Sequence, residues 1–281
     1  MDATDCEVMQ VEGLAYKRII TSTKYGKVFL VEWLKYNQMF SLQKIERSHY
    51  EQNAINIIRN LYHFNVIKVY KTYMREKFVY LLMDYCPFDV KRYIEERGIL
   101  SESRFAEAAY YMIQSIRSMH SKRICHNSIR PSKFLVDKYG RVQISKFNHA
   151  VQYKNTEEKE FKHAKSVDVW GLGVTFYFML TGRLITDLYF DEEIAMTKVF
   201  SHIIFPSNVS NECIHLITAC LNNNEKSRAS LDNLLESPLF QPFRPTKIGP
   251  TKQPSFSANN SMRSIPIIVK PVLTRLVSVA N

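Results

Sequence analysis

The sequence predicts an α+β fold, with strands in its N-terminal part and helices in the remainder. Five short runs near the N-terminus alternate apolar and polar residues, which is typical of strands that bury one face. These runs are residues 16–20, 27–32, 39–45, 66–73 and 78–83. The N-terminal part is therefore expected to form a sheet.

Helices are predicted further along the chain. Ser101 is a residue type that caps helices, and it precedes a set of apolar residues that recur at helical spacing. The set is Phe105, Ala109, Met112, Ile116 and Met119. A second apolar run, 169–180, is too short to cross a bilayer and fits a buried core helix.

The composition indicates one large domain with a packed core. The chain has 281 residues, of which 46% are hydrophobic, including seventeen Phe and sixteen Tyr. The five cysteines are scattered and never spaced C-x-x-C, so neither a zinc site nor a disulfide framework is predicted. The start, MDATDCEVMQ, lacks the apolar centre of a secretory signal. We therefore expect a cytoplasmic protein without a membrane span.

The charge is strongly basic, at +11, and the segment from Arg244 onward carries six Lys and Arg with no Asp or Glu. Such a tail can attract acidic partners or nucleic acid, but it is more often simply solvated. Past Phe243 the tail holds one aromatic residue, Phe256, so it lacks the stacking platform of a nucleic-acid binder. Protein partners are favoured over nucleic acid.

The most informative motif runs from Cys125 to Ala150, CHNSIRPSKFLVDKYGRVQISKFNHA. Its frame is His126, Arg130, Pro131 and then Phe147. It resembles the catalytic loop and metal-binding turn of protein kinases, which in active members have H-R-D-x-K-P-x-N and later D-F-G. The resemblance implies a bilobal protein-kinase-like fold, with a β-rich small lobe and a mostly helical large lobe.

Within this frame, the residues that perform the chemistry are replaced. Ser128 stands at the position of the catalytic base, and Lys133 at that of the metal-binding asparagine. Lys146 replaces the metal-binding aspartate, and Asn148 replaces the glycine that follows it. Because lysines repel Mg²⁺ and serine is not a base near neutral pH, no metal ligand and no catalytic residue are predicted here.

The predicted small lobe shows the same kind of loss. In the segment that resembles the glycine-rich loop, Thr21 and Thr23 replace two glycines, and Gly26 remains. Gln43 stands at the position of the phosphate-pairing lysine. Lys44 is one residue further on, and such a shift in a strand points a side chain to the opposite face.

The helix that presents a glutamate to that lysine is expected after the capping-box pattern 48–51. Its glutamate position is occupied by Ala54, while Glu51 lies one turn earlier. We therefore keep one alternative open: a divergent serine/threonine kinase that binds ATP and uses Lys44 or Glu51 out of register.

The apolar frame of an adenine pocket, by contrast, is kept. The segment 80–86 resembles the linker that binds adenine through its backbone, with Met83 guarding the back of the pocket. The residues of this vestigial pocket are Val28, Ser41, Met83, Asp84, Cys86 and Leu135. Ile58, His126 and Phe147 stand where the family stacks a column between the lobes, and core packing explains them as well.

Further motifs set the boundaries of the domain. Segments 166–173 and 226–240 resemble the central helix and the closing segment of kinases. We predict an N-terminal extension (1–13), a kinase-like domain (14–243, with a small lobe 14–85 and a large lobe 86–243) and a basic tail (244–281). Between Asn148 and Asp168 the segment that holds the activation loop is short and lacks A-P-E. Arg228, which pairs with that glutamate in the family, is left with Glu158 or Glu160 as candidates.

Taken together, the resemblance implies a serine/threonine-type kinase relative, similar to calcium/calmodulin-dependent kinases in the segments LYHFNVIKVY and KSRASLDNLLESPLF. We expect a catalytically inactive pseudokinase that acts as a regulatory or scaffold partner of other proteins, such as an active kinase or a signalling complex. No cofactor is required, and ATP binding without metal is the nucleotide mode left open. The apolar end 265–279 either docks in a groove or is disordered.

Overall fold

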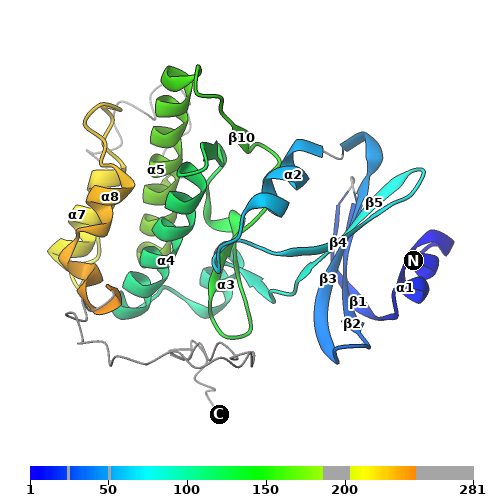
Figure 1. The fold of residues 1–281 in the computed structure, drawn as a ribbon. Coiled ribbons are helices and arrows are strands. Elements are labelled where there is room, and N and C mark those ends of the chain that lie inside the picture. The colour runs from blue at the N-terminus through cyan, green and yellow to red at the C-terminus, as the bar shows by residue number, and fades with distance from the viewer. Residues whose placement is uncertain (24–25, 50–51, 186–202, 245–281) are drawn as a thin grey trace, which may run out of the picture.

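The computed structural model describes residues 1–23, 26–49, 52–185 and 203–244. They form two lobes, one dominated by a sheet and one by helices (Figure 1). The tail segment 245–281, for which docking was considered, and Glu51, the alternative partner for a lysine, lie outside the described residues. The predicted α+β class with its division into lobes is confirmed.

The small lobe contains a five-stranded antiparallel sheet. In spatial order it consists of β1 (Leu14–Thr23), β2 (Gly26–Trp33), β3 (Gln38–Glu46), β5 (Phe78–Asp84) and β4 (Val69–Met74). All five expected strands are present, but β4 begins at Val69 rather than at residue 66. Val66 instead makes an isolated bridge to Ile144 in the other lobe.

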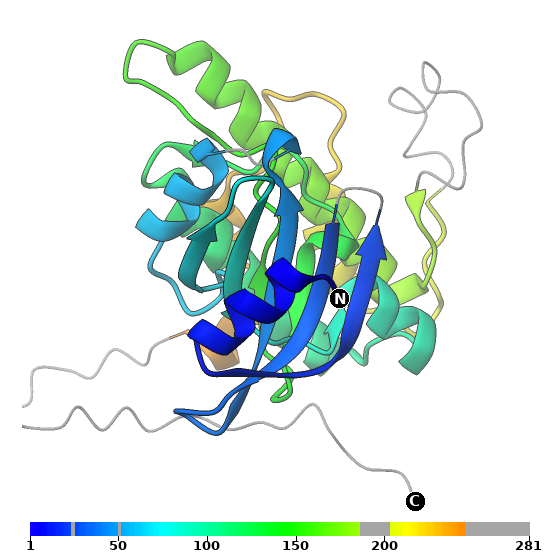
Figure 2. The same ribbon diagram turned by 90° about the vertical axis from the view of Figure 1, so that its right-hand side faces the viewer.

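The outer face of this sheet is covered by α1 (Ala3–Val11), as Figure 2 shows. Asp2 caps the helix, and its side chain and that of Asp5 form a reciprocal capping box. Val8 and Met9 of the helix pack with Phe29 and other buried residues of the sheet into a separate core. Residues 1–13 were expected to be an extension, but they include a helix that completes the small lobe.

The inner side of the small lobe carries α2 (Gln52–Asn60). The capping-box prediction for this helix was wrong at its first residue. Ser48 lies in η1 (Arg47–His49), a short 3-10 helix, and its hydroxyl bonds to Nδ1 of His49 rather than to the start of α2.

The large lobe is built around α4 (Glu102–His120) and α5 (Glu158–Thr181). The five apolar residues predicted on one face of α4 are all buried, and the run 169–180 lies in the buried part of α5. Ser101 occupies the N-cap position, although its side chain makes no capping hydrogen bond. Gly171 lets α5 approach the catalytic-loop segment, because a Cβ there would lie 2.6 Å from the carbonyl oxygen of Ile129.

The other elements surround this pair of helices. The helices are α3 (Val90–Arg97), α7 (Asn211–Cys220) and α8 (Leu231–Leu235), with the 3-10 turns η2 (Pro131–Lys133) and η5 (Pro238–Phe243). Small sheets pair β6 (Phe88–Asp89), β8 (Phe134–Val136) and β9 (Val142–Ile144), and β7 (Ile124–Cys125) with β10 (Val151–Gln152). Within the described residues, none of the helices is long and apolar enough to span a bilayer.

Candidate functional site

A cavity of about 370 Å³ lies between the two lobes. It is lined by strands of the small lobe, by the linker that follows β5, and by residues of the large lobe around β8 and 145–148. All six residues that the sequence assigned to an adenine pocket line it: Val28, Ser41, Met83, Asp84, Cys86 and Leu135. The structure thus brings together residues that are up to about a hundred positions apart in the chain.

Ser41 affects the linker in a way that the sequence analysis missed. Its hydroxyl donates a hydrogen bond of 2.8 Å to the carbonyl oxygen of Asp84. This carbonyl lies at the end of β5, in the segment 80–86 whose backbone groups are expected to bind adenine, so one of its two lone pairs is already used. The available signal was a hydroxyl at a position where the family has alanine.

The register of β3 separates Gln43 from Lys44. Gln43 lines the cavity, whereas the buried side chain of Lys44 lies on the opposite face of the strand. There its ammonium donates to the carboxylates of Asp2 and Asp5, at 2.8 Å for Asp5 Oδ1. Lys44 is therefore held in the outer core of the small lobe and does not reach the cleft.

Interactions of its charge also hold the Lys44 side chain on this outer face of the sheet. Burial alone would lower the pKa of Lys44, but its hydrogen bonds to Asp2 and Asp5 outweigh burial and raise the pKa. Asp5 Oδ1 additionally accepts a hydrogen bond of 2.7 Å from the hydroxyl of Tyr80. The ammonium also lies 3.9 Å from the centre of the Phe78 ring, within cation–π distance.

The back of the cleft is neutral and apolar among the described residues. Ala54 of α2 lines the cavity at the position where a glutamate was expected in an active kinase. Its neighbours there are aliphatic: Ile45, Ile55, Ile58 and Ile67. With Gln43 on the facing strand, no ion pair can form between these two positions.

The acidic groups that do line the cavity are engaged elsewhere. Asp84 Oδ1 accepts a hydrogen bond of 2.7 Å from the hydroxyl of Tyr70. Asp89 Oδ1 accepts from the backbone N–H of Arg92, which caps α3. Neither carboxylate comes from the loop positions at which active kinases carry their metal ligands.

Those loop positions hold Lys133 and Lys146. Lys133 is 5% exposed, and its ammonium donates to the carbonyl oxygen of Lys146 at 3.4 Å. Lys146 lines the cavity, has a left-handed backbone conformation (φ +61°), and donates to the carbonyl oxygen of Ser132 at 2.8 Å. The two ammonium groups are thus bound to backbone oxygens of the same loops.

The surroundings of Lys133 disfavour its charge. Burial, followed by the nearby charges of Arg130 and Lys146, lowers the pKa of Lys133 to about 8. A divalent cation placed among these groups would meet positive charge and lysine nitrogens, whereas Mg²⁺ prefers oxygen ligands. The residues present do not fit the magnesium site that the kinase resemblance implies.

Ser128, at the position of the catalytic base, is half-buried and is not among the residues that line the cavity. The backbone around it is held by Asp168 of α5. The two carboxylate oxygens accept hydrogen bonds of 2.8 Å from the N–H groups of His126 and Asn127. Asp168 therefore fixes the catalytic-loop turn, in which Asn127 has a positive φ of 57°.

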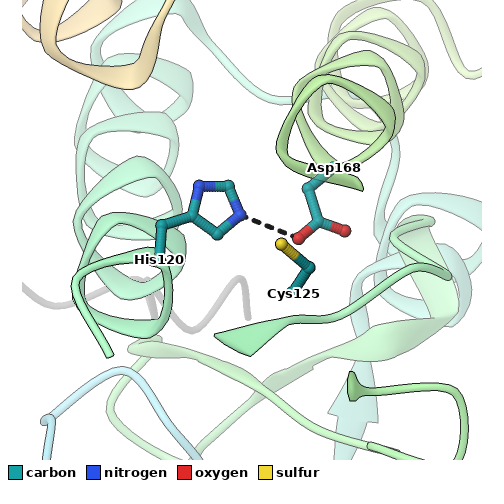
Figure 3. Close-up of side chains that lie close together, drawn as sticks. All are labelled: His120, Cys125 and Asp168. Carbon is teal, nitrogen blue, oxygen red and sulfur yellow. Dashed lines mark hydrogen bonds and ion pairs between the residues drawn. The ribbon is translucent and has the colours of Figure 1, made fainter. Parts of the chain in front are cut away.

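The same carboxylate also bonds to His120, and Cys125 lies beside the pair (Figure 3). These residue types can bind metal, but their geometry here does not favour it. His120 Nε2 and Asp168 Oδ2 are 2.9 Å apart, which is a hydrogen-bond distance. Burial also raises the pKa of the Cys125 thiol, so the thiolate that a metal needs is disfavoured. The trio fits a structural hydrogen-bonded cluster.

His126 has the surroundings of a structural residue. Its side chain is fully buried, its Nε2 bonds to the carbonyl oxygen of Ser145 at 3.0 Å, and burial lowers its pKa. Its ring lies 5.3 Å from that of Phe147. Phe147 and Ile58 both line the cavity and belong to the main hydrophobic core. These three residues lie along the junction of the lobes, as expected.

The segment that follows the cavity is short. β10 ends at Gln152 and α5 begins at Glu158, so five residues connect them. Glu158 pairs with Arg123 at 3.0 Å rather than with Arg228. Arg228 donates instead to the carbonyl oxygen and hydroxyl of Ser166, so the ion pair considered for Glu158 is not formed.

Comparisons with known proteins agree with this geometry. The family model "Protein kinase domain" matches residues 14–240. Probable serine/threonine-protein kinase MARK-A of Dictyostelium discoideum is 25% identical, over 80% of this chain and 23% of that protein. Aurora kinase A-A of Xenopus laevis is 24% identical, over 81% of this chain and 62% of that protein.

A third relative is serine/threonine-protein kinase PLK4 of Danio rerio, 27% identical over 74% of this chain and 24% of that protein. The chain thus spans less than two thirds of the length of these curated relatives. The similarity to calcium/calmodulin-dependent kinases in particular stays a prediction. The family match, covering both lobes and the cleft, shows that the chain belongs to the eukaryotic serine/threonine protein kinase family.

Proposed function

We propose that this protein kinase domain does not transfer phosphate and acts as a regulatory or scaffold partner of other proteins. The observation that carries the proposal is that Lys133 and Lys146 occupy the two positions at which active kinases carry metal ligands. Phosphoryl transfer depends on divalent cations that neutralise the phosphates and on a carboxylate that orients the attacking hydroxyl. The described part of the cleft offers neither at these positions.

The size of the loss supports the same conclusion. Active kinases use a phosphate-pairing lysine, its partner glutamate, a catalytic base and two metal ligands. In this chain those positions hold Gln43, Ala54, Ser128, Lys133 and Lys146. A positioned charge is commonly worth several kcal/mol in a transition state, so even partly additive losses amount to about 10 kcal/mol. By the transition-state relation, this lowers the rate by about seven orders of magnitude.

The competing function is a divergent serine/threonine kinase with displaced catalytic groups. Its support is that the relatives named above are themselves called kinases. Lys44, one of its two candidate groups, is held by Asp5 on the far side of β3, which argues against this function. The other, Glu51, lies outside the described residues.

A ligand in the cleft, if one binds, is proposed to bind without metal. Val28, Met83 and Leu135 give the cavity an apolar lining that suits an aromatic base, and Lys146 supplies positive charge near the expected position of the phosphates. Opposing factors are Thr21 and Gln43, which replace phosphate contacts, and the hydroxyl of Ser41 on the linker carbonyl. The alternative is therefore that the cavity binds no nucleotide.

Thermal unfolding in the presence of ATP, with and without Mg²⁺, tests this proposal. The expected result is no stabilisation, or a stabilisation that is unchanged by Mg²⁺ or by chelation with EDTA. Stabilisation that requires Mg²⁺ would show that the cleft holds a metal and would contradict the proposal. The variant Leu135→Trp, which fills the cavity, serves as the control that any effect arises in this cleft.

A further inference from the structure

A second concave site lies on the large lobe and shares no lining residue with the cleft. It is a groove of about 500 Å³ between the C-terminal end of α4, the first turns of α5 and the segment that enters α8. Apolar side chains contribute to its lining, among them Val169 and Leu231, and charged side chains line the rest. The charged residues are Arg117, Lys162, Lys165, Arg228, Glu225 and Asp232.

Arg228 is the fixed centre of this groove. Its Nε donates to the carbonyl oxygen of Asn222 at 3.0 Å, and its Nη1 donates to Ser166. Its guanidinium also lies 5.0 Å from the ring of Trp170. Within the described residues no carboxylate forms an ion pair with it, although the charge of nearby Glu225 acts on it, and its Nη2 donates no hydrogen bond. A half-buried guanidinium is therefore held in place with one edge unused.

The acidic residues of the groove are already paired with other groups. Asp232 accepts from Arg117 at 2.7 Å, and Glu225 pairs with His163 at 2.9 Å. Because even a partly buried charge is stabilised by an opposite charge, an external carboxylate at Arg228 would gain both Coulomb energy and hydrogen bonds.

Two lysines on the first turns of α5 add to the positive charge. Lys162 is largely exposed, and among the described residues it makes a single ion pair, a long contact of 3.9 Å to Glu158. Lys165 has no carboxylate partner in the described part of the chain, and its ammonium lies 4.7 Å from the Phe161 ring. Both can move toward a ligand, because neither is fixed by a short ion pair.

The groove is open among the described residues. The undescribed tail, 245–281, contains no Asp or Glu, so none of its side chains can supply a carboxylate. The apolar part of the lining also favours a peptide carboxylate over a free phosphate. Val169 and Leu231 suit the carbon atoms of a peptide, whereas a free phosphate has no apolar part to contact them.

We propose that this groove docks an acidic segment of a partner protein, with a glutamate or aspartate carboxylate on Arg228 and Lys162 and Lys165 at its side. The inference rests on the proposed protein-binding role and gives the partner its chemistry. Phosphoryl transfer is measured separately, so a failure of docking leaves the proposed lack of catalysis untouched.

The test uses the full chain and a fluorescent degenerate peptide library with one fixed glutamate, compared with the same library carrying glutamine. Fluorescence anisotropy should show preferential binding of the glutamate library, weakened by salt. Arg228→Gln should weaken it about ten-fold or more, because a charged hydrogen bond is lost. Equal binding of the two libraries would overturn the proposal.

Arg228 also supports the loop at Asn222, so Arg228→Gln could weaken binding by unfolding the chain. A second variant therefore tests the groove without changing Arg228. Lys165→Glu, at a partly exposed position, should weaken binding of the glutamate library by about five-fold. Lys159→Glu makes the same change on the same helix outside the groove and should leave binding unchanged. Equal effects of the two substitutions would mean a nonspecific charge effect and would overturn the site.

The chain's own segment 186–202, which carries Asp187, Asp191, Glu192 and Glu193, is the competing occupant. Converting these four to amides should leave peptide binding unchanged. Binding that appears only in this variant would show that the chain's own segment fills the groove, and would overturn the assignment to a partner protein.

Discussion

Lys44 and Asp5 form a buried ion pair, with 2.8 Å between Nζ and Oδ1, that fastens α1 to the outer face of the sheet. The pair lies on the side of β3 opposite to the cleft, where Gln43 lines the cavity. A lysine one residue away from the phosphate-pairing position has thus become part of the small-lobe core. The same contact links the N-terminal helix to the fold and removes Lys44 from any role in phosphate binding.

The first prediction concerns the stability of this contact. Lys44→Met should lower the free energy of unfolding by about 3 kcal/mol, because it leaves the fully buried Asp5 without its cation. Urea denaturation measures the change. The matched control is Lys17→Met, which removes an ion pair to Glu32 in which the lysine is 39% exposed, and should cost under about 1 kcal/mol. Equal costs would show that the buried pair is not a main anchor.

The second prediction is that Lys133 destabilises the fold at neutral pH. Its pKa is lowered from 10.5 to about 8, so the folded state binds this proton less tightly than the unfolded chain does. Between about pH 8 and pH 10.5 the unfolded chain holds more protons, and the free energy of unfolding should rise with pH. Lys133→Met should raise that free energy by about 1–3 kcal/mol near pH 7 and flatten this dependence.

Urea denaturation across this pH range checks the effect of Lys133. Lys159→Met, at an exposed position, is the control and should keep the parental pH profile. A Lys133→Met variant that is less stable than the parent near neutral pH would contradict the assignment of a penalised buried cation.

The third prediction assigns any nucleotide binding to lysine charge rather than to metal. Lys146→Ala should abolish stabilisation by ATP in a thermal-shift titration, since it removes the lysine cation that lines the cavity near the expected position of the phosphates. Arg183→Ala, which changes an exposed charge in the large lobe outside the cavity, should leave the shift intact. An ATP-induced shift that survives Lys146→Ala unchanged would exclude this mode.

The fourth prediction concerns repair of the site. The quadruple variant Gln43→Lys, Ser128→Asp, Lys133→Asn and Lys146→Asp should still not phosphorylate peptides robustly. Five residues connect β10 to α5, which leaves little chain to form the platform for a peptide substrate. Strong activity toward peptides would show that this platform is supplied in another way. Mg²⁺-dependent ATP binding by the variant would show that the metal positions themselves had been restored.

Much of the fold was predictable because periodic patterns and family motifs act locally. Residues such as Phe105 and Met112 occur at helical spacing, and all strands of the small lobe were predicted from alternation. The opposite orientations of Gln43 and Lys44 also followed from the two-residue period of a strand. These features depend on backbone geometry, which a short stretch of sequence specifies.

The remaining features depend on contacts between distant residues. The packing of α1 rests on Asp5 meeting Lys44 and Tyr80, and no local pattern predicts such a meeting. Likewise, the hydrogen bond from Ser41 to Asp84 joins residues in two strands. The start of α2 was predicted too early, because Ser48 formed a local 3-10 turn instead of a cap. In these cases the structure is determined by a local turn or by contacts between distant residues, which the sequence periodicity does not report.

The most direct test of the central claim is a radiometric phosphorylation assay of the purified chain with Mg²⁺ and with Mn²⁺ on general protein substrates. Leu135→Trp, which fills the cleft, serves as the matched control for activity from contaminating kinases. The proposal predicts that the parent and Leu135→Trp give the same background incorporation with either metal. Metal-dependent transfer by the parent that disappears in Leu135→Trp would show that this cleft catalyses phosphoryl transfer and would contradict the account.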